Sequence, residues 1–492
     1  MPLWPRRTYL DHNATTPLAR EVRHAMAACL KKTHGNPSSL HIAGRTARGS
    51  VEQARRSVAS LLGCESEDVY FTSGGTEANN AVIKGVLAAA GGGHVVTTKI
   101  EHDSVLGACG QVEKAGGRVT YVPAGPDGRV RPDNVAAAIR PDTVLISVMH
   151  ANNETGAIQP IPEIAALARR AGVPLHTDAV QTFGKLPTHV DELGCEFLTL
   201  SAHKINGPKG AGALYWRGRT KWTPLIAGGD QERKMRTGTE GVHQIVGLGA
   251  AAALAARRMG GEWDRLRELR RRAVEGLRRL YPQVRINESP EPWQMPGSIN
   301  ATFPDLSGLS LLAGLDCHEI GVSIGSACTA DRIEPSHVLL GMGLSAQDAL
   351  STIRISMGTT TAPADIKYFL WAMKRVLRGD PDGLEWLPPE HLTTDRIRSS
   401  FVIDLRMTYE RVISPGIPTA RLWSHIGFEK RFRQIPRDRE VVLMCTTGIF
   451  SFEAGYRLAR AGHPAVRVVY GGYQAWKALY PDLLSRLRSG AD

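Results

Sequence analysis

Three short stretches carry residues whose types and spacing suit the binding of a phosphate-bearing pyridine cofactor. Lys204 follows Ser201 and His203 and precedes several glycines, a pattern that suits a lysine forming a Schiff base beside a phosphate. Asp178 ends an apolar run, at the sheet edge where α/β proteins bind ligands. In residues 71–79 a Gly-Gly turn leads from a strand into a helix, so backbone N–H groups can approach a phosphate. Singly, Asp178 could be a cap and Lys204 a surface charge; together they predict such a site, with Asp178 keeping the pyridine nitrogen protonated.

Two of the seven cysteines also lie in surroundings that favour chemistry. Cys328 stands among Gly, Ser, Asp and Arg residues in the polar stretch 323–337, which predicts an exposed loop and therefore an accessible nucleophile. Cys445 directly follows an apolar run and precedes a tight turn into a helix, where N–H groups favour a thiolate or an anion. A buried structural cysteine is the alternative at that position. The remaining cysteines lack such surroundings and are interpreted as packed thiols: Cys29, Cys64, Cys109, Cys195 and Cys317.

The elements that must position these residues alternate between β-branched runs and Ala-rich helical patterns. We expect buried strands at 68–72, 94–98, 118–122, 143–148 and 173–177. Helices are expected between them, at 78–90, 104–115 and 161–171. This alternation is typical of an α/β fold with a mostly parallel sheet covered by helices on both faces.

Beyond this sheet the pattern changes twice. Residues 241–280 predict one long helix, and a further α+β unit extends to about residue 378. Turn-forming residues at 379–383 and 388–389 then indicate a break, after which a shorter β/α rhythm begins. In that last part we expect strands at 401–404, 440–444 and 466–470, and helices from Ser451 and Tyr473. We therefore divide the chain into a first unit at 1–380, a linker at 381–394 and a small α/β domain at 395–492. Within the first unit, 16–250 form a large domain, and the N-terminal segment joins 251–380 in a small lobe.

Composition limits the classes of protein that remain. The chain has 492 residues, of which 42% are hydrophobic and 22% charged, as in ordinary globular proteins of about three domains. An odd number of scattered cysteines forms no disulfide framework, and the N-terminus lacks a secretory signal, so we expect a cytoplasmic protein without a membrane span. The net charge of +12 is accompanied by no nucleic-acid-binding motif. It is interpreted as a solvated face or a surface for anionic ligands or an acidic protein, and no nucleic-acid partner is expected.

Over residues 8–375 the sequence resembles the NifS/IscS-like cysteine desulfurases, which are pyridoxal-phosphate enzymes of fold type I. Besides the stretches above, the resemblance depends on motifs in the same order along the chain: Tyr9–Pro17, Gly35–His41, Glu101-His102, Asn152–Ile161, Arg236–Glu240, Gly325–Cys328 and Ile353–Ser356. It implies pyridoxal 5'-phosphate as cofactor, L-cysteine as substrate, no metal ligands, and a homodimer with its active sites at the subunit interface.

The resemblance also implies a role for each matching residue. Lys204 would form the Schiff base, and His102 would stack on the ring and act in acid/base steps. Asp178 would pair with the pyridine nitrogen and Gln181 with the ring hydroxyl. The phosphate would be held by Gly75, Thr76, Ser201 and His203, with Thr239 contributed by the other subunit. Asn153 and Arg354 would bind the substrate carboxylate, and Cys328 would accept sulfur as a persulfide.

Residues from about 395 to 485 resemble a single rhodanese domain, in which Cys445 would carry sulfane sulfur. The resemblance depends on Ile403–Arg406 with Glu410, on the Cys445 loop and on Val469–Trp476. Phe450 stands where the family loop commonly has an arginine, and residues 414–420 depart from the family's usual segment. Loss of that cation disfavours a small dianion as sulfur donor and leaves room for a bulkier or less charged partner.

The sequence as a whole therefore predicts a cysteine desulfurase fused to a rhodanese-type sulfurtransferase. Sulfur would pass from L-cysteine to Cys328, then to Cys445, and on to a thiol such as glutathione or to an acceptor protein. One alternative keeps the cofactor but makes the chain a selenocysteine lyase or another β-lyase. A second alternative makes the C-terminal domain a non-catalytic docking module.

Overall fold

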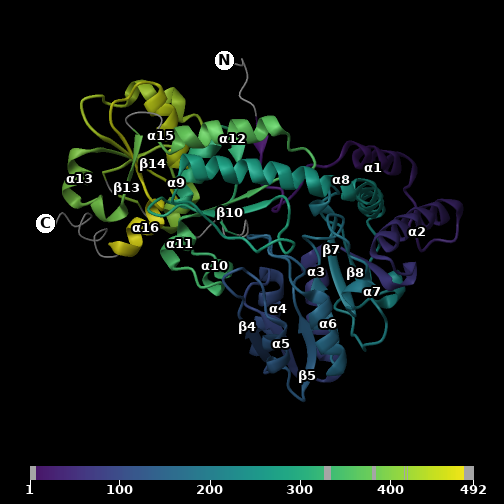
Figure 1. The fold of residues 1–492 in the computed structure, drawn as a ribbon. Helices are drawn as coiled ribbons and strands as arrows, with labels where there is room; N and C mark the ends of the chain where they lie inside the picture. The colour runs from purple at the N-terminus through teal and green to yellow at the C-terminus, as the bar shows by residue number, and fades with distance from the viewer. Residues whose placement is uncertain (1–6, 326–333, 379–383, 415, 418, 481–492) are drawn as a thin grey trace.

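The elements divide the chain into a large domain, a small lobe and a C-terminal unit (Figure 1). The computed structural model describes residues 7–325, 334–378, 384–414, 416–417 and 419–480. Within these ranges, no helix combines the length and the hydropathy that crossing a bilayer requires.

A seven-stranded sheet forms the centre of the large domain. Its strands, in spatial order, are β2 (Val69–Thr72), β8 (Gly212–Trp216), β7 (Phe197–Ser201), β6 (Leu175–Asp178), β5 (Thr143–Ser147), β3 (His94–Thr98) and β4 (Arg118–Val122). β8 runs antiparallel to both of its neighbours, and the other pairs are parallel. All residues of β2, β3, β6 and β7 are buried, which explains their apolar and β-branched composition. The mostly parallel sheet is confirmed.

Helices cover both faces of this sheet. Three of them lie close to the predicted ranges: α3 (Gly75–Ala90), α4 (Asp103–Lys114) and α6 (Ile161–Arg170). The shorter α5 (Pro132–Ala138) and α7 (Val190–Leu193) complete the connections. Sequence reasoning did not include α1 (Arg20–Lys32), α2 (Ile42–Leu62), β7 or β8. Both missing helices pack against α8 (Val242–Leu280), the long helix predicted at 241–280.

The helix α8 joins the large domain to the small lobe, since its first half lies in one hydrophobic core and its second half in the other. The lobe contains an antiparallel sheet of β12 (Thr352–Ser356), β10 (Ser298–Thr302) and β9 (Arg285–Ile286). Its helices are α9 (Gly308–Cys317), α10 (His337–Gly341), α11 (Ala346–Leu350) and α12 (Pro363–Val376). The N-terminal strand β1 (Thr8–Tyr9) pairs with β11 (Ile320–Gly321), so the chain start lies in the lobe.

The C-terminal unit is a second, smaller α/β structure with a fully parallel sheet. Its strands, in spatial order, are β13 (Leu384–Leu387), β17 (Val466–Val469), β16 (Val441–Met444), β14 (Phe401–Asp404) and β15 (Arg421–Leu422). Its helices are α13 (Thr394–Ser399), α14 (Thr408–Ile413), α15 (Ile449–Arg460) and α16 (Gly472–Leu479). Part of the stretch predicted as a linker at 381–394 is thus strand β13. Flanking Pro and Gly residues masked its short apolar pattern, Leu-Glu-Trp-Leu.

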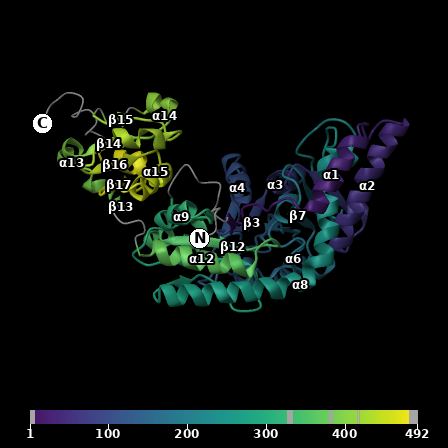
Figure 2. The ribbon, with the colours of Figure 1, turned by 90° about the horizontal axis from the view of Figure 1, so that it is seen from above.

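The C-terminal unit is packed against the small lobe through helices α9 and α15, which lie beside each other (Figure 2). Ala313 of α9 belongs to the same hydrophobic core as the strands β14 and β16. At the end of α9, the ring of His318 meets that of Tyr456 of α15 edge-on, with centroids 5.8 Å apart. The two units are therefore joined by a packed interface as well as by the chain.

Candidate active site

The predicted phosphate-binding residues gather at the N-terminus of α3 and at the end of β7. A side chain at Gly75 would place its Cβ 2.7 Å from Val180, so the N–H groups of the first turn of α3 stay accessible only with glycine there. Ser201 is buried at the end of β7. His203 lies in the following turn, where Nδ1 is 3.1 Å from Thr15 Oγ1, and burial lowers its pKa to about 4. This neutral, polar cradle suits a phosphate oxygen array.

Asp178 and His102 are joined by a chain of hydrogen bonds. Asn79 Nδ2 donates to Asp178 Oδ2 at 2.7 Å and to Ser104 Oγ at 2.9 Å, and Ser104 Oγ lies 2.8 Å from His102 Nδ1. The backbone N–H of Ser104 also donates to His102 Nδ1 at 3.1 Å, so the neutral ring carries its proton on Nε2. The network fixes the orientation of the His102 ring and leaves Nε2 as the nitrogen that carries the proton.

Asp178 is also the group that tests whether a pyridinium fits. It is buried, accepts a second hydrogen bond from the backbone N–H of Val180 at 2.9 Å, and makes no ion pair among the described residues. A buried carboxylate is costly without an opposite charge. Close by, Asn79 Oδ1 is buried without a hydrogen-bond partner in the described part of the chain. A protonated ring nitrogen would supply the missing cation, so the residues present fit pyridoxal phosphate.

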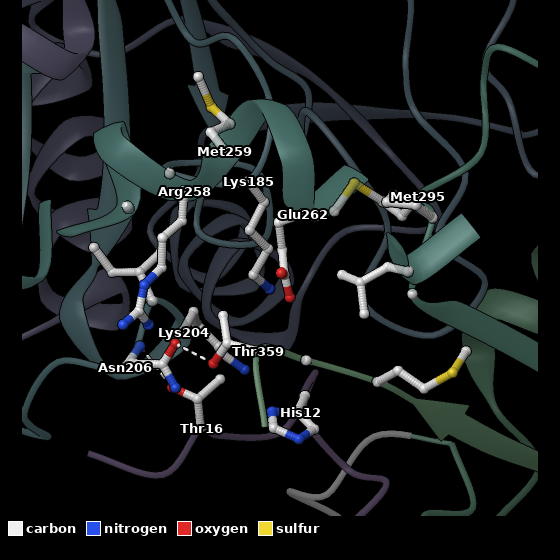
Figure 3. A pocket seen from close by; sticks show the side chains of 18 of the residues that line it. His12, Thr16, Lys185, Lys204, Asn206, Arg258, Met259, Glu262, Met295 and Thr359 are labelled. Carbon is white, nitrogen blue, oxygen red and sulfur yellow. Dashed lines mark hydrogen bonds between the residues drawn. The ribbon is translucent and has the colours of Figure 1, made fainter. Parts of the chain in front are cut away.

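Lys204 lies deep in the pocket, close to a second buried lysine (Figure 3). Its Nζ donates to the carbonyl oxygens of Asn13 and Ala14, the latter at 2.8 Å. Burial first, and then the charge of Lys185, lower the pKa of Lys204 to about 7. A large fraction of the side chain is therefore the neutral amine, the form that attacks a carbonyl.

Gln181 connects the two lysines. Its Nε2 donates to the carbonyl oxygen of Asn13 at 2.9 Å, and its Oε1 accepts from Lys185 Nζ at 3.4 Å. Because the ammonium can only donate, it fixes which side of the Gln181 amide is the oxygen. Lys185 is a residue that sequence reasoning missed, since a lysine after Gly184 has no pattern that distinguishes it from a surface charge.

Arg354 on β12 is almost fully buried and lies beside Asp11 and Asn153. Its Nη2 donates to Asp11 Oδ1 at 2.8 Å and its Nη1 to the carbonyl oxygen of Asn153 at 3.2 Å. Nε is buried and has no partner among the described residues, so one guanidinium donor is available. The structure thus brings Arg354 and Asn153 together as predicted. It adds Asp11 as the counter-charge, which no spacing in the sequence indicated.

Two further predicted residues are placed less directly. Thr239 is exposed in the segment before α8, where Arg236 pairs with Glu77 of α3 at 2.9 Å. Cys328 lies outside the described residues. The ends of its segment are described: Ser323 exchanges two backbone hydrogen bonds with Arg354, at 3.0 and 2.7 Å. At the other end Ser336 Oγ donates to Glu154 Oε2 at 2.6 Å, so both ends are tied beside Arg354 and Asn153.

Cys445 forms a second candidate site at the end of β16. Its thiol is buried, and its Sγ accepts from the backbone N–H of Gly448 at 3.2 Å and from Ser451 Oγ at 3.5 Å. A Cβ on Gly472 would lie 2.3 Å from the Cys445 carbonyl oxygen, and its φ is +61°, so glycine is needed to close the loop. The N-terminus of α15 and these donors favour a sulfur anion at this position.

The other cysteines differ from Cys445 in their environment. Burial raises the pKa of Cys64, Cys109 and Cys195 to about 12, and that of Cys317 further still. Cys29 is buried in the large-domain core. Thiols with such high pKa values are poor nucleophiles at neutral pH. Among the described residues, no group of His, Cys, Asp and Glu side chains is arranged to hold a metal ion.

Comparison with known proteins agrees with this geometry. The family model described as aminotransferase class-V matches residues 8–369, and the rhodanese-like domain model matches residues 390–479. The chain belongs to the class-V aminotransferases and, within them, to the cysteine desulfurase family. The relative "Cysteine desulfurase IscS" of Dictyoglomus turgidum is 46% identical over 374 residues, which are 76% of this chain and 95% of the relative. That of Methanosarcina thermophila is 42% identical over 390 residues, covering 79% and 96%.

Solved structures show the same relationship. A structure described as a NifS-like protein aligns with a TM-score of 0.71 and 34% identity, and it covers 76% of this chain and all of its own. Enzymes of this family use pyridoxal phosphate, and the pocket around Lys204 and Asp178 has the donors that this cofactor needs. The cofactor of this desulfurase-family chain is therefore pyridoxal phosphate. The C-terminal rhodanese-like domain lies outside the region that these relatives share.

Proposed function

We propose that the chain converts L-cysteine to L-alanine, keeps the sulfur as a persulfide on Cys328, and passes it to Cys445 and then to an external thiol. The observation that carries the first step is the attachment of both ends of the Cys328 segment beside the residues suited to bind the substrate. Ser323 is hydrogen-bonded to Arg354 through the backbone. Cys328 follows Ser323 by five residues, so the chain keeps the Cα atoms of Ser323 and Cys328 within about 18 Å of each other.

Each residue of the pocket then has a defined task. Arg354 binds the substrate carboxylate through its free donor, while Asp11 and Asn153 hold the guanidinium in place. Asp178 holds a proton on the ring nitrogen, and His102 Nε2 gives or takes a proton above the ring. Pyridoxal phosphate, when bound, supplies an electron sink for bond breaking at the substrate.

The sulfur steps need no external oxidant. The Cys328 thiolate attacks the substrate sulfur, an S–S bond forms as the C–S bond breaks, and the carbon accepts a proton, so that alanine leaves. The Cys445 thiolate then attacks the terminal sulfur of that persulfide, and Cys328 leaves as a thiolate. The N–H of Gly448 and the hydroxyl of Ser451 stabilise the sulfur anion on Cys445. Because both cysteines are on one chain, the transfer between them can be intramolecular.

We also propose that the enzyme works as a homodimer, in which the partner subunit's Thr239 completes the phosphate site. The support is the exposure of Thr239 on a segment anchored to α3 by Arg236 and Glu77.

One experiment tests the relay. The purified protein is mixed with L-cysteine and alkylated, and persulfides are mapped by mass spectrometry in wild type, Cys328→Ser and Cys445→Ser. We expect persulfide on both cysteines in wild type, on neither in Cys328→Ser, and on Cys328 alone in Cys445→Ser. Undiminished labelling of Cys445 without Cys328 would refute the relay.

The same samples separate the alternatives. A selenocysteine lyase would release alanine from L-selenocysteine much faster than from L-cysteine. Phe450, which stands in place of the expected loop cation, favours a docking module as the second candidate for the C-terminal domain. A docking module would leave sulfur delivery to an acceptor intact in Cys445→Ser.

A further inference from the structure

Large apolar side chains are exposed on the loops that surround Cys445. Seven large apolar side chains of the C-terminal unit are exposed within the described residues, and all but Leu479 come from elements that follow β14, β15 or β16. These six are Tyr409, Val412, Ile413, Leu422, Ile426 and Phe450, and each exposes more than half of its surface. Loops after parallel strands meet at one edge of the sheet, which here is the edge that carries Cys445.

Two side-chain contacts connect these loops to the Cys445 loop. Glu410 of α14 accepts a hydrogen bond from Thr446 Oγ1, the residue after Cys445. Phe450 stacks on His425 with ring centroids 4.7 Å apart, which brings the segment after β15 to the start of α15. Figure 2 shows α14 and β15 on the side of the unit away from α9. The six side chains therefore form one surface, which we call the apolar rim.

The orientation of α14 follows from its own hydrogen bonds. Glu410 accepts from the backbone N–H of Met407 at 2.6 Å and from Thr446, so this face of the helix is turned toward the Cys445 loop. Tyr409, Val412 and Ile413, at i, i+3 and i+4, share one exposed face of the helix. The hydrogen bonds of Glu410 anchor this helix while three of its apolar side chains remain exposed to solvent. Such an exposed apolar group favours an interaction surface, because it contributes no buried area to the fold.

Cations border the apolar rim. Lys477 Nζ donates at 2.8 Å to Oγ of Ser414, the residue that follows Ile413. The Arg431 guanidinium lies 5.2 Å from the ring centroid of Trp423, the residue that follows Leu422. Both cations are exposed, and within the described part of the chain neither is ion-paired with a carboxylate. A complementary partner therefore carries carboxylates around an apolar contact.

We propose that the apolar rim docks an acidic protein, whose thiol receives sulfur from Cys445. The inference rests on the proposed function of Cys445 as a sulfur carrier and names the class of its acceptor. A small polar thiol such as glutathione covers few of six large side chains, whereas a protein surface covers them together. In the transfer, the acceptor thiolate attacks the terminal sulfur of the Cys445 persulfide. A new S–S bond forms, the old one breaks, and Cys445 leaves as a thiolate that takes up the acceptor's proton.

Two synthetic peptides and glutathione serve as probes with the full-length protein. Each peptide has one cysteine between Leu and Phe residues, and the flanks are Asp and Glu in one and Lys and Arg in the other. Cys445 is loaded with L-cysteine, or with polysulfide if L-cysteine does not load it, and the transfer measured with Cys445→Ser is subtracted as background. Loading by L-cysteine thus reports on the proposed function, and the peptide comparison reports on docking independently.

We expect the acidic peptide to become persulfidated at least tenfold faster than the basic one. The triple variant Val412→Ser, Ile413→Ser, Ile426→Ser should lose most of this advantage, as should Arg431→Glu with Lys477→Glu. Transfer to glutathione should change less than twofold in both. Leu479→Ser, which removes an apolar side chain outside the rim that is also more than half exposed, is the control and should behave as wild type. Equal rates for the two peptides, or an acidic preference that survives the triple variant, would overturn the proposal.

Discussion

Replacing the buried Lys185 by methionine should stabilise the apoprotein at neutral pH, and the gain should disappear in alkali. Lys185 and Lys204 line the same cavity. Among the described residues, the Lys185 ammonium donates one hydrogen bond, to Gln181 Oε1 at 3.4 Å. Burial lowers its pKa from 10.5 to about 8. The folded protein therefore holds this charge at a cost that methionine, an apolar side chain of similar length, does not carry.

The sign and the size of the effect follow from that pKa. The unfolded chain keeps the proton up to about pH 10.5, whereas the folded chain releases it near pH 8. Below pH 8 the difference of about 2.5 pKa units costs the folded state about 3 kcal/mol, and the cost falls to zero between pH 8 and 10.5. Losing the hydrogen bond to Gln181 returns about 1 kcal/mol, so Lys185→Met should gain about 2 kcal/mol at pH 7.

Urea unfolding of the apoprotein at pH 7, 9 and 10.5, followed by near-ultraviolet circular dichroism, measures this difference. Lys367→Met removes an exposed lysine of α12 and is the control, for which we expect less than 0.5 kcal/mol at every pH. A Lys185→Met protein that is less stable than wild type at pH 7, or whose gain persists unchanged at pH 10.5, would refute the buried-charge reasoning.

Three more expectations concern the same pocket. Covalent uptake of added pyridoxal phosphate by the apoprotein, followed by absorbance, should accelerate with rising pH through a midpoint near 7, because only neutral Lys204 is a nucleophile; a flat profile from pH 6 to 9 would contradict this. Asp11→Asn removes the carboxylate that holds the Arg354 guanidinium in place, so KM for L-cysteine in alanine release should rise several-fold, and an unchanged KM would exclude this positioning role. Asn79→Leu removes the hydrogen bond to Asp178 and should weaken cofactor binding about tenfold by fluorescence titration, whereas Asn80→Leu should not.

Sequence reasoning located the large-domain strands and helices well because their burial imposes a regular pattern. Every residue of β3 and β7 is buried, for example, yet only β3 was predicted, since Phe197–Ser201 has no turn signal before the glycines that follow. The sequence motifs also identified Lys204, Asp178 and Arg354 as residues of one active site. Asn79 and Asp11 were within quoted motifs, but their partners are 99 and 343 residues away, so their roles depend on the tertiary fold.

The apolar rim shows the same limit on a larger scale. Its members are scattered from Tyr409 to Phe450, and each alone resembles an ordinary core residue in the sequence. Only the order of strands in the C-terminal sheet brings their loops to one edge. The net charge of +12 was interpreted as a solvated face or a surface for anionic ligands or an acidic protein, and the position of Arg431 beside Trp423 favours the acidic protein.

The packing of α9 against α15 affects whether the desulfurase unit can be expressed without the C-terminal domain. The curated relatives match about three quarters of this chain. In this chain Ala313 of α9 belongs to the hydrophobic core of the C-terminal unit, and Cys317 packs against that core. A chain truncated after α12 would expose these apolar side chains of α9 to water, so it should associate more readily than the full-length chain. The desulfurase unit and the C-terminal domain therefore cannot be separated at this boundary without uncovering an apolar surface.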